Sequence, residues 1–267
     1  MANEGQHQQW NNPNWVKTWK GLEPSVSNVL EPLLNALAAK PGENVLDVGC
    51  GGGLTTLSIA QQVGPDGSAV GFDISEPLLE LASSRAKEAE ISNAHFVHGD
   101  AQVEDAPGGP FDAATSRLGV MFFADPPAAF ANIRRQLRPG GRLVFLCFQA
   151  AADNPWYPGP ALAKYGPPPP PSDYLPISPF ALGEQLRTNK ILESAGFDDI
   201  HFHPLVTEWD GRLDLGAGAG LIKQLRLSDA HAEQANKDVL TYLEGLATDG
   251  RDRVPRKYWI VSAKNPG

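Results

Sequence analysis

The stretch VLDVGCGGG at residues 45–53 decides the fold expected for this chain. An apolar, strand-like run leads into a turn of small residues, and residues 54–63 continue with a helical pattern. Glycines at such a turn let the backbone bend sharply and let a ligand approach the main chain. The helix that follows should offer unpaired N–H groups and the positive end of its dipole. The stretch therefore predicts a strand–turn–helix unit with a ligand site at its turn.

Strand and helix patterns alternate from this unit to residue 148. The expected strands are 44–49, 68–73, 94–98, 111–117 and 142–148, and the expected helices are 54–63, 76–90 and 126–137. Short apolar strands that alternate with amphipathic helices indicate an α/β fold, a parallel sheet with helices on both faces. A helix at 184–195 and two further strands, 200–206 and 257–263, are expected beyond it.

Two segments outside the core are expected to act as caps. The N-terminal residues carry Trp10, Trp15 and Trp19, more tryptophan than a solvated tail uses. An amphipathic helix follows over 26–37 and should bend or restart at Pro32. The other cap follows the fifth strand, where ligands bind in open sheets, so we interpret it as a lid rather than a spacer. It contains the proline run 167–171.

These patterns predict one domain over residues 1–267. Its expected parts are an N-terminal cap and helix at 1–40, a ligand-binding core at 41–150, a Pro-rich insertion at 149–180 and the rest of the sheet at 181–267, with a helical insertion at 211–250.

Composition narrows the partners that are expected. The chain has 22 Lys and Arg against 31 Asp and Glu, a net charge of −9, which disfavours nucleic acid and makes a neutral or cationic small substrate electrostatically easier. The two cysteines have no CxxC neighbour, and His201 and His203 alone are a weak zinc signal, so neither a disulfide framework nor a metal site is expected. No leader or membrane-spanning run is apparent, which predicts a cytoplasmic protein without membrane contact.

Two carboxylates suggest which ligand the turn binds. Asp47 stands at the end of the first strand, where it could bond an ammonium group, and Asp73 ends the second strand, where it could accept two ribose hydroxyls. A nicotinamide dinucleotide site uses the same ribose acid, but its GxGxxG fingerprint needs a glycine where this chain has Leu54. Asp47 would also repel a pyrophosphate. An NAD(P)-dependent oxidoreductase therefore stays as the alternative.

The chain resembles the class I, Rossmann-like S-adenosylmethionine-dependent methyltransferases at four motifs. Residues 45–53 are similar to motif I, Asp73 matches the ribose-binding acid, HGDA at 98–101 resembles the adenine motif, and LRPGGRL at 137–143 resembles the turn before the fifth strand. The motifs occur in order within about residues 20–150, which makes the joint signal specific. SRLGVMFF at 116–123 and NPW at 154–156 are similar to a bacterial small-molecule branch loosely related to the quinone-pathway enzymes.

The resemblance implies a seven-stranded, mostly parallel sheet whose last strand is antiparallel, with S-adenosyl-L-methionine as cofactor. The cofactor residues expected are Asp47, Gly49, Cys50, Gly51, Asp73, Ile74, Asp100, Ala101 and Arg117. The substrate pocket is expected to be walled by Trp10, Trp15, Phe122 and Trp156. The expected reaction is methyl transfer to an O, C or N nucleophile of a small molecule, by a monomer or homodimer. No catalytic base is assigned, so a catalytically silent cofactor-binding protein is a further alternative.

Overall fold

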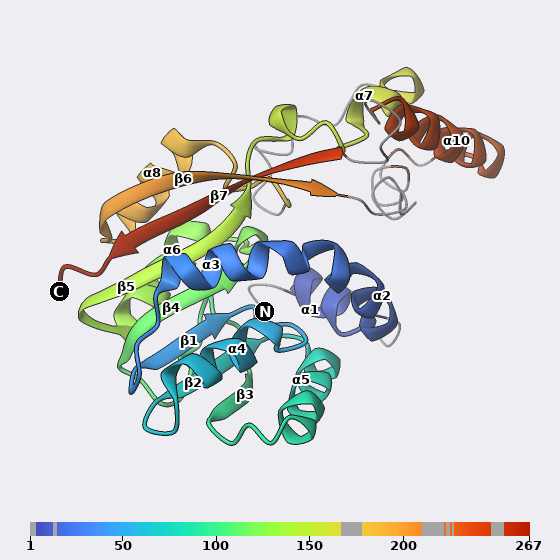
Figure 1. Ribbon diagram of the computed structural model, residues 1–267. Helices are drawn as coiled ribbons and strands as arrows, with labels where there is room; N and C mark the ends of the chain where they lie inside the picture. Colours follow the sequence, from blue (N-terminus) through green and yellow to red (C-terminus); the bar gives the residue numbers. More distant parts are fainter. Residues whose placement is uncertain are drawn as a thin grey trace.

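The computed structural model describes residues 4–12, 15–166, 178–209, 222, 225, 227–246 and 254–267 (Figure 1). Its seven strands are β1 (Asn44–Val48), β2 (Ser68–Asp73), β3 (Ala94–His98), β4 (Phe111–Arg117), β5 (Leu137–Phe148), β6 (Asp198–Trp209) and β7 (Val254–Lys264). They form one sheet in the order β3-β2-β1-β4-β5-β7-β6. Strands β1 to β5 pair in parallel, and β7 is antiparallel to both β5 and β6. The predicted fold class is confirmed.

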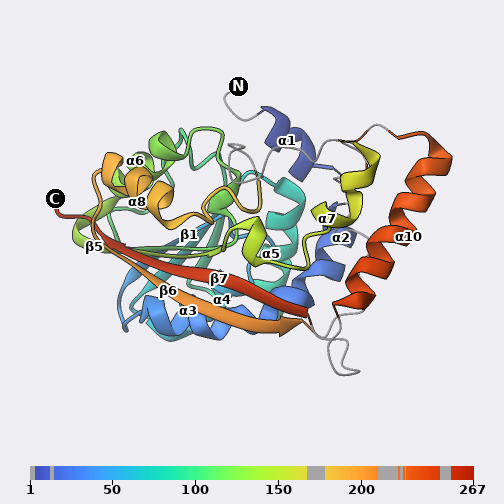
Figure 2. The same cartoon turned by 90° about the horizontal axis from the view of Figure 1, so that it is seen from above.

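Helices cover both faces of this sheet, as expected for parallel strands that must be buried on both sides. Figures 1 and 2 place α3 (Leu30–Leu37) and α4 (Leu54–Val63) on one face, and α6 (Pro126–Gln136) and α8 (Gln185–Ser194) on the other. Helix α5 (Glu76–Glu88) packs beside β3. Most residues of the central strands are buried, and Leu46 and Phe145 are both at 0% exposure.

Three strands are longer than their patterns predicted. β5 begins at Leu137 rather than 142, because Leu137 pairs with Phe111 before a register shift at the Pro-Gly-Gly turn. β6 and β7 extend to Trp209 and from Val254, and their register holds to these last residues. These extra residues pair with each other and not with the rest of the sheet, so no buried apolar pattern marks them.

The N-terminal segment forms four short helices. They are α1 (Glu4–Trp10), α2 (Trp15–Leu22), the 3-10 helix η1 (Glu23–Val29) and α3. The expected restart at Pro32 is wrong by two residues, since the change from η1 to α3 falls between Val29 and Leu30. Pro32 lies in the first turn of α3, where the N–H it lacks would have no acceptor in the helix.

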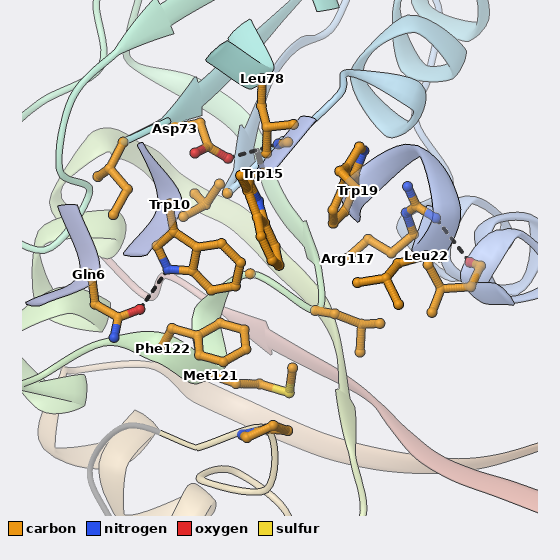
Figure 3. A pocket seen from close by; sticks show the side chains of 18 of the residues that line it. Gln6, Trp10, Trp15, Trp19, Leu22, Asp73, Leu78, Arg117, Met121 and Phe122 are labelled. Atoms are coloured by element: carbon orange, nitrogen blue, oxygen red, sulfur yellow. Dashed lines mark hydrogen bonds between the residues drawn. The ribbon is translucent and has the colours of Figure 1, made fainter. Parts of the chain in front are cut away.

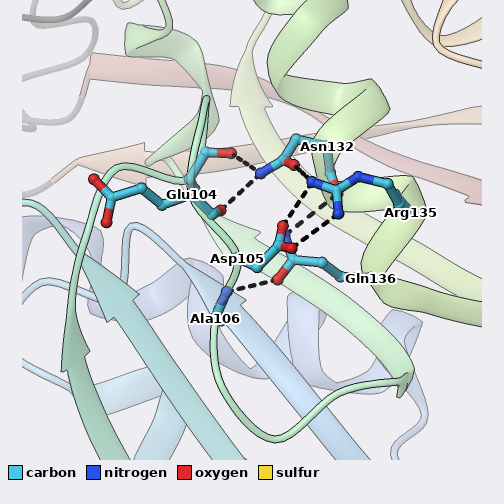
Figure 4. A network of polar contacts seen from close by, with 7 residues as sticks. Glu104, Asp105, Ala106, Asn132, Arg135 and Gln136 are labelled. Atoms are coloured by element: carbon cyan, nitrogen blue, oxygen red, sulfur yellow. Dashed lines mark hydrogen bonds and ion pairs between the residues drawn. The ribbon is translucent and has the colours of Figure 1, made fainter. Parts of the chain in front are cut away.

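The connection from β3 to β4 is fixed to α6 by a polar network (Figure 4). Asn132 donates to the carbonyls of Ala101 (3.1 Å) and Glu104 (2.7 Å), and Arg135 forms a two-bond pair with Asp105. The side chain of Gln136 accepts from the N–H of Ala106 at 2.8 Å. The turn that follows β3 is therefore held rigidly.

Smaller elements lie along the carboxyl edge and beyond it. They are η2 (Val120–Phe122), η3 (Ala151–Asp153), α7 (Gly159–Leu162), η4 (Ala163–Tyr165) and α10 (Asp229–Gly245). Helices α7 and α10 share a small apolar cluster apart from the main core. The predicted proline run at 167–171 and much of the insertion at 211–250 fall outside the described residues. None of the described helices has the length and apolar character needed to cross a membrane.

Candidate functional site

A cavity of about 610 Å³ opens at the carboxyl edge of the sheet. Its floor comes from the ends of β1, β2 and β4, through Val48, Asp73 and Arg117. Its roof comes from the N-terminal helices, and Figure 3 shows Trp10, Trp15 and Trp19 projecting over this floor. The volume lies in the range of about 300–1,000 Å³ typical of small-molecule sites.

The glycine turn after β1 forms one wall of the cavity. Gly49 and Gly51 have φ of +68° and +52°, backbone conformations that favour glycine. A Cβ on Gly49 would lie 2.9 Å from the Cα of Gly119, and one on Gly51 would lie 3.0 Å from the ring of Trp19. Both positions therefore require a residue without a side chain, as the sequence predicted.

Asp73 lies at the centre of the site. Its Oδ2 accepts from the N–H of Gly51 at 2.7 Å, and its Oδ1 accepts from the N–H of Ser75 at 2.9 Å. Burial raises the pKa of this carboxyl, and the backbone hydrogen bonds oppose that shift. Each oxygen of a carboxylate can accept a second bond, so Asp73 can bind a ligand hydroxyl while it holds both turns.

Three backbone N–H groups of the glycine turn donate to acceptors within the protein, which differs from the expectation of unpaired donors. The N–H of Gly49 donates to Phe72 and that of Gly53 to Cys50, and Asp73 takes that of Gly51. No residue of α4 lines the cavity. The positive group on this wall is Arg117, which donates to Thr55 Oγ1 and to the Val26 carbonyl. Burial lowers its pKa.

Asp47 and Cys50 lie behind the wall rather than on it. Successive side chains of a strand point to opposite faces, and Asp47 faces α4, where its Oδ2 accepts from Thr56 at 2.6 Å. Burial raises the pKa of Asp47 to about 7, against the opposing effects of Thr56 and Arg117. Cys50 is also buried, and burial raises the pKa of its thiol. Neither residue lines the cavity.

The buried Asp47 should make the stability of the ligand-free protein fall between about pH 5 and pH 7. The folded pKa of about 7 exceeds the unfolded value of about 4, so stability present at low pH is lost as the pH rises through the folded pKa. At about 1.4 kcal/mol per unit, this loss is roughly 2–3 kcal/mol. Urea unfolding across this interval should show a flatter profile for Asp47→Asn, and parallel profiles for the two proteins would contradict the prediction.

Asp100 and Ala101 line the cavity on the side of β3. Asp100 is buried, and its Oδ1 accepts from the N–H of Gln102 at 3.0 Å. Asn132 of α6 donates to the carbonyl of Ala101 and so holds this residue in place. Ile74 lines the same wall, so the predicted ribose and adenine positions are brought together.

The four aromatic residues predicted for a substrate pocket all line this cavity. Trp10 packs edge-on against Trp15 and Phe122, with ring centroids 4.6 Å and 5.1 Å apart. Trp156 lies farther along, 5.0 Å from Phe148. The indole N–H of Trp15 is buried without a hydrogen-bond partner among the described residues.

Several wall residues were missed by the sequence analysis. They include Gln6, Trp19, Met121, Phe148 and Arg256. Trp19 had been noted only as part of the cap. The place of Arg256 could have been found by pairing the last strand antiparallel to the fifth, because the start of such a strand lies at the carboxyl edge.

The roof is fastened to the turns that follow β1 and β2. Asn11 donates to the Ile74 carbonyl at 2.8 Å and accepts from the Glu76 N–H at 3.0 Å, at the start of α5. Arg85 of α5 forms a two-bond ion pair with Glu23 and also donates to the Gly52 carbonyl at 2.7 Å. The glycine turn, the turn after β2 and the N-terminal helices are therefore one connected structure.

Comparison with known proteins identifies the core that carries this cavity. Residues 39–164 match the family model described as a methyltransferase domain. The nocamycin O-methyltransferase of Saccharothrix syringae is 31% identical over 199 residues, which are 74% of this chain and 62% of that protein. The demethylmenaquinone methyltransferase of Listeria welshimeri is 31% identical over 121 residues, 45% of this chain and 50% of that enzyme. The chain thus matches about half to two thirds of the length of these relatives.

A solved structure agrees with this identification at the level of the fold. The phosphoethanolamine N-methyltransferase 2 of Haemonchus contortus, in complex with S-adenosyl-L-methionine, superposes with a TM-score of 0.56 at 18% identity, covering 90% of this chain and 53% of that one. The sheet order, the glycine turn and the acid after β2 agree with the family match. This chain therefore carries a class I S-adenosylmethionine-dependent methyltransferase domain.

Proposed function

We propose that this protein transfers a methyl group from S-adenosylmethionine to an oxygen, carbon or nitrogen nucleophile of a small molecule. One observation carries the proposal: a single cavity joins the glycine turn and Asp73 to a compartment of aromatic side chains. The names of the two curated relatives, an antibiotic O-methyltransferase and a demethylmenaquinone methyltransferase, support a small acceptor. The roof of N-terminal helices supports it too, because it narrows the space above the site.

The residues on the wall fit the parts of the cofactor. Asp73 is suited to accept the ribose hydroxyls, and Asp100 with Ala101 is suited to meet the adenine. Arg117 is suited to bind the carboxylate, because it is the cation on this wall and three N–H groups of the glycine turn already donate within the protein. When bound, the cofactor supplies a methyl group that its sulfonium makes electrophilic.

The remaining task of the protein is to hold the nucleophile in line with the methyl group and to keep water out. Positioning of this kind can contribute roughly 7–11 kcal/mol to a reaction between bound partners. Trp10 packs against both Trp15 and Phe122 over the site, so these rings can shield the sulfonium and restrict the acceptor. The Asn11 and Arg85 contacts keep this roof in place during the reaction.

Calorimetry with S-adenosylmethionine and S-adenosylhomocysteine tests the cofactor half of the proposal. We expect both to bind at micromolar concentration and NADH not to compete. The transfer half is tested by S-adenosylhomocysteine release with a panel of phenols, enols and amines. No binding of either compound at millimolar concentration would refute the proposal, and binding without turnover on any acceptor would favour a catalytically silent binding protein.

A further inference from the structure

The charged residues that line the cavity are unevenly placed. In the described part of the chain they are Asp73, Asp100, Arg117 and Arg256. The first three lie at or just beyond the carboxyl ends of β2, β3 and β4, on the side assigned to the cofactor. Arg256 lies on β7, the second strand beyond β4, on the side left for the acceptor.

The antiparallel direction of β7 is what brings Arg256 to this edge. Tyr258 pairs with Phe148, the last residue of β5, so Arg256 extends two residues past the end of that strand. Its Nη1 donates to the carbonyl of Ser25 in η1 at 3.0 Å. The guanidinium therefore spans from the sheet to the roof across the acceptor side of the cavity.

The side chains packed around this guanidinium are mainly aromatic, and Ser25 is a polar neighbour. Its Cζ lies 5.3 Å from the ring centroid of Trp156, which packs against Phe148, and Phe148 stacks on Tyr258 at 4.8 Å. Arg256 is only 8% exposed, and this burial lowers its pKa, although an arginine stays protonated in proteins. A positive charge is thus kept beside aromatic walls, where its field is weakly screened.

We propose that the acceptor is a planar organic anion, a ring that carries a carboxylate, enolate or phenolate group. This inference rests on the proposed function and narrows its substrate class. The ring would pack against Trp156 and Phe148, and its negative charge would be bound by Arg256. The net charge of −9 disfavours anions on average over the protein surface, but physiological salt screens charges that lie more than about 8 Å from the ligand. Inside the cavity, Arg256 is the charged residue on the side left for the acceptor, so its charge has the strongest effect on which acceptor binds there.

Paired ligands that differ in charge but not in shape test the inference. Calorimetry on the protein saturated with S-adenosylhomocysteine would compare 2-naphthoate with 2-naphthamide, and ionised 4-hydroxycoumarin with the neutral 4-aminocoumarin. We expect the anion of at least one pair to bind about 10- to 100-fold more tightly, the range for a hydrogen bond to a charged group. A preference in the naphthoate pair would indicate a carboxylate acceptor, and a preference in the coumarin pair would indicate an enolate.

Variants then assign the preference to Arg256. In Arg256→Gln the ratio of the two affinities should fall below about threefold, and Arg256→Lys should retain part of it. The matched control is Arg138→Gln, which removes the same charge from an exposed pair with Asp112 and should leave the ratio unchanged. The wild-type ratio is informative even if Arg256→Gln does not fold.

Two results would overturn the inference. One is equal affinity for the anion and its neutral partner in both pairs. The other is an anion preference that persists in Arg256→Gln. Absence of S-adenosylhomocysteine binding would instead contradict the proposed function, so the two failures can be told apart in the same samples.

Discussion

Asp73→Ala should weaken S-adenosylmethionine binding about 100-fold or more. The carboxylate is suited to accept two ribose hydroxyls, and hydrogen bonds to a charged group contribute about 1.5–3 kcal/mol each. The same substitution removes the acceptor for the Gly51 and Ser75 N–H groups, so the turns after β1 and β2 lose the side chain that holds them both. Calorimetric titration of the purified variant measures the effect directly.

Two further variants show whether the loss at Asp73 is specific. Asp73→Asn keeps one acceptor oxygen but places an NH₂ group against a backbone donor, so it should lose nearly as much affinity as alanine. Asp66→Ala removes an equal charge from the exposed turn before β2, at the opposite edge of the sheet, and should bind normally. Affinity within about threefold of wild type in Asp73→Ala would refute the assignment of the ribose site.

Asn154→Ala should lower the free energy of unfolding by about 3 kcal/mol or more. Asn154 is fully buried, and its Nδ2 lies within 3.1–3.3 Å of the carbonyls of Gln149, Ala150 and Lys257. Its Oδ1 accepts from the Lys257 N–H and the Trp156 indole. Alanine leaves several of these buried groups unpaired, at about 1–3 kcal/mol each. Equilibrium urea unfolding measures the loss.

The network at Asn154 also fixes the aromatic wall, which gives the prediction a second readout. Without Asn154 the Trp156 indole loses its acceptor, so the affinity for a planar acceptor should fall in the folded variant. Asn236→Ala is the matched control, because this partly exposed asparagine of α10 donates, among the described residues, to the Ala232 carbonyl of its own helix. If both alanine variants lose the same stability, Asn154 has no special structural role.

Local sequence patterns predicted the fold well where a strand is buried by its own neighbours. The bounds of β2, β3 and β4 agree with the predicted 68–73, 94–98 and 111–117. The start of β5 was missed, because Pro139, Gly140 and Gly141 are typical of a turn although they continue the pairing with β4. The ends of β6 and β7 were missed because their backbone partners are each other rather than the central strands, and no local apolar pattern marks them.

Site residues could be predicted where they belong to one local motif. Contacts between segments that are far apart in the sequence could not be predicted. The glycine turn and Asp73 were found because both sit at strand ends that share an edge. The bonds of Arg117 to Val26 and of Arg256 to Ser25 join segments 91 and 231 residues apart, which no local pattern indicates. The direction of the Asp47 side chain, toward α4 and away from the cavity, follows from the alternation of side chains along β1.

The long β6–β7 pairing has a consequence for changes in the connection between these two strands. Trp209 pairs with Val254, so the pairing of the two strands fixes the distance between the two ends of the connection over residues 210–253. Lengthening or replacing a segment with fixed ends adds little closure entropy, about 0.6 kcal/mol per doubling. Changes in the length or sequence of the connection between β6 and β7 should therefore leave the paired strand ends, and the position of Arg256 beside them, undisturbed.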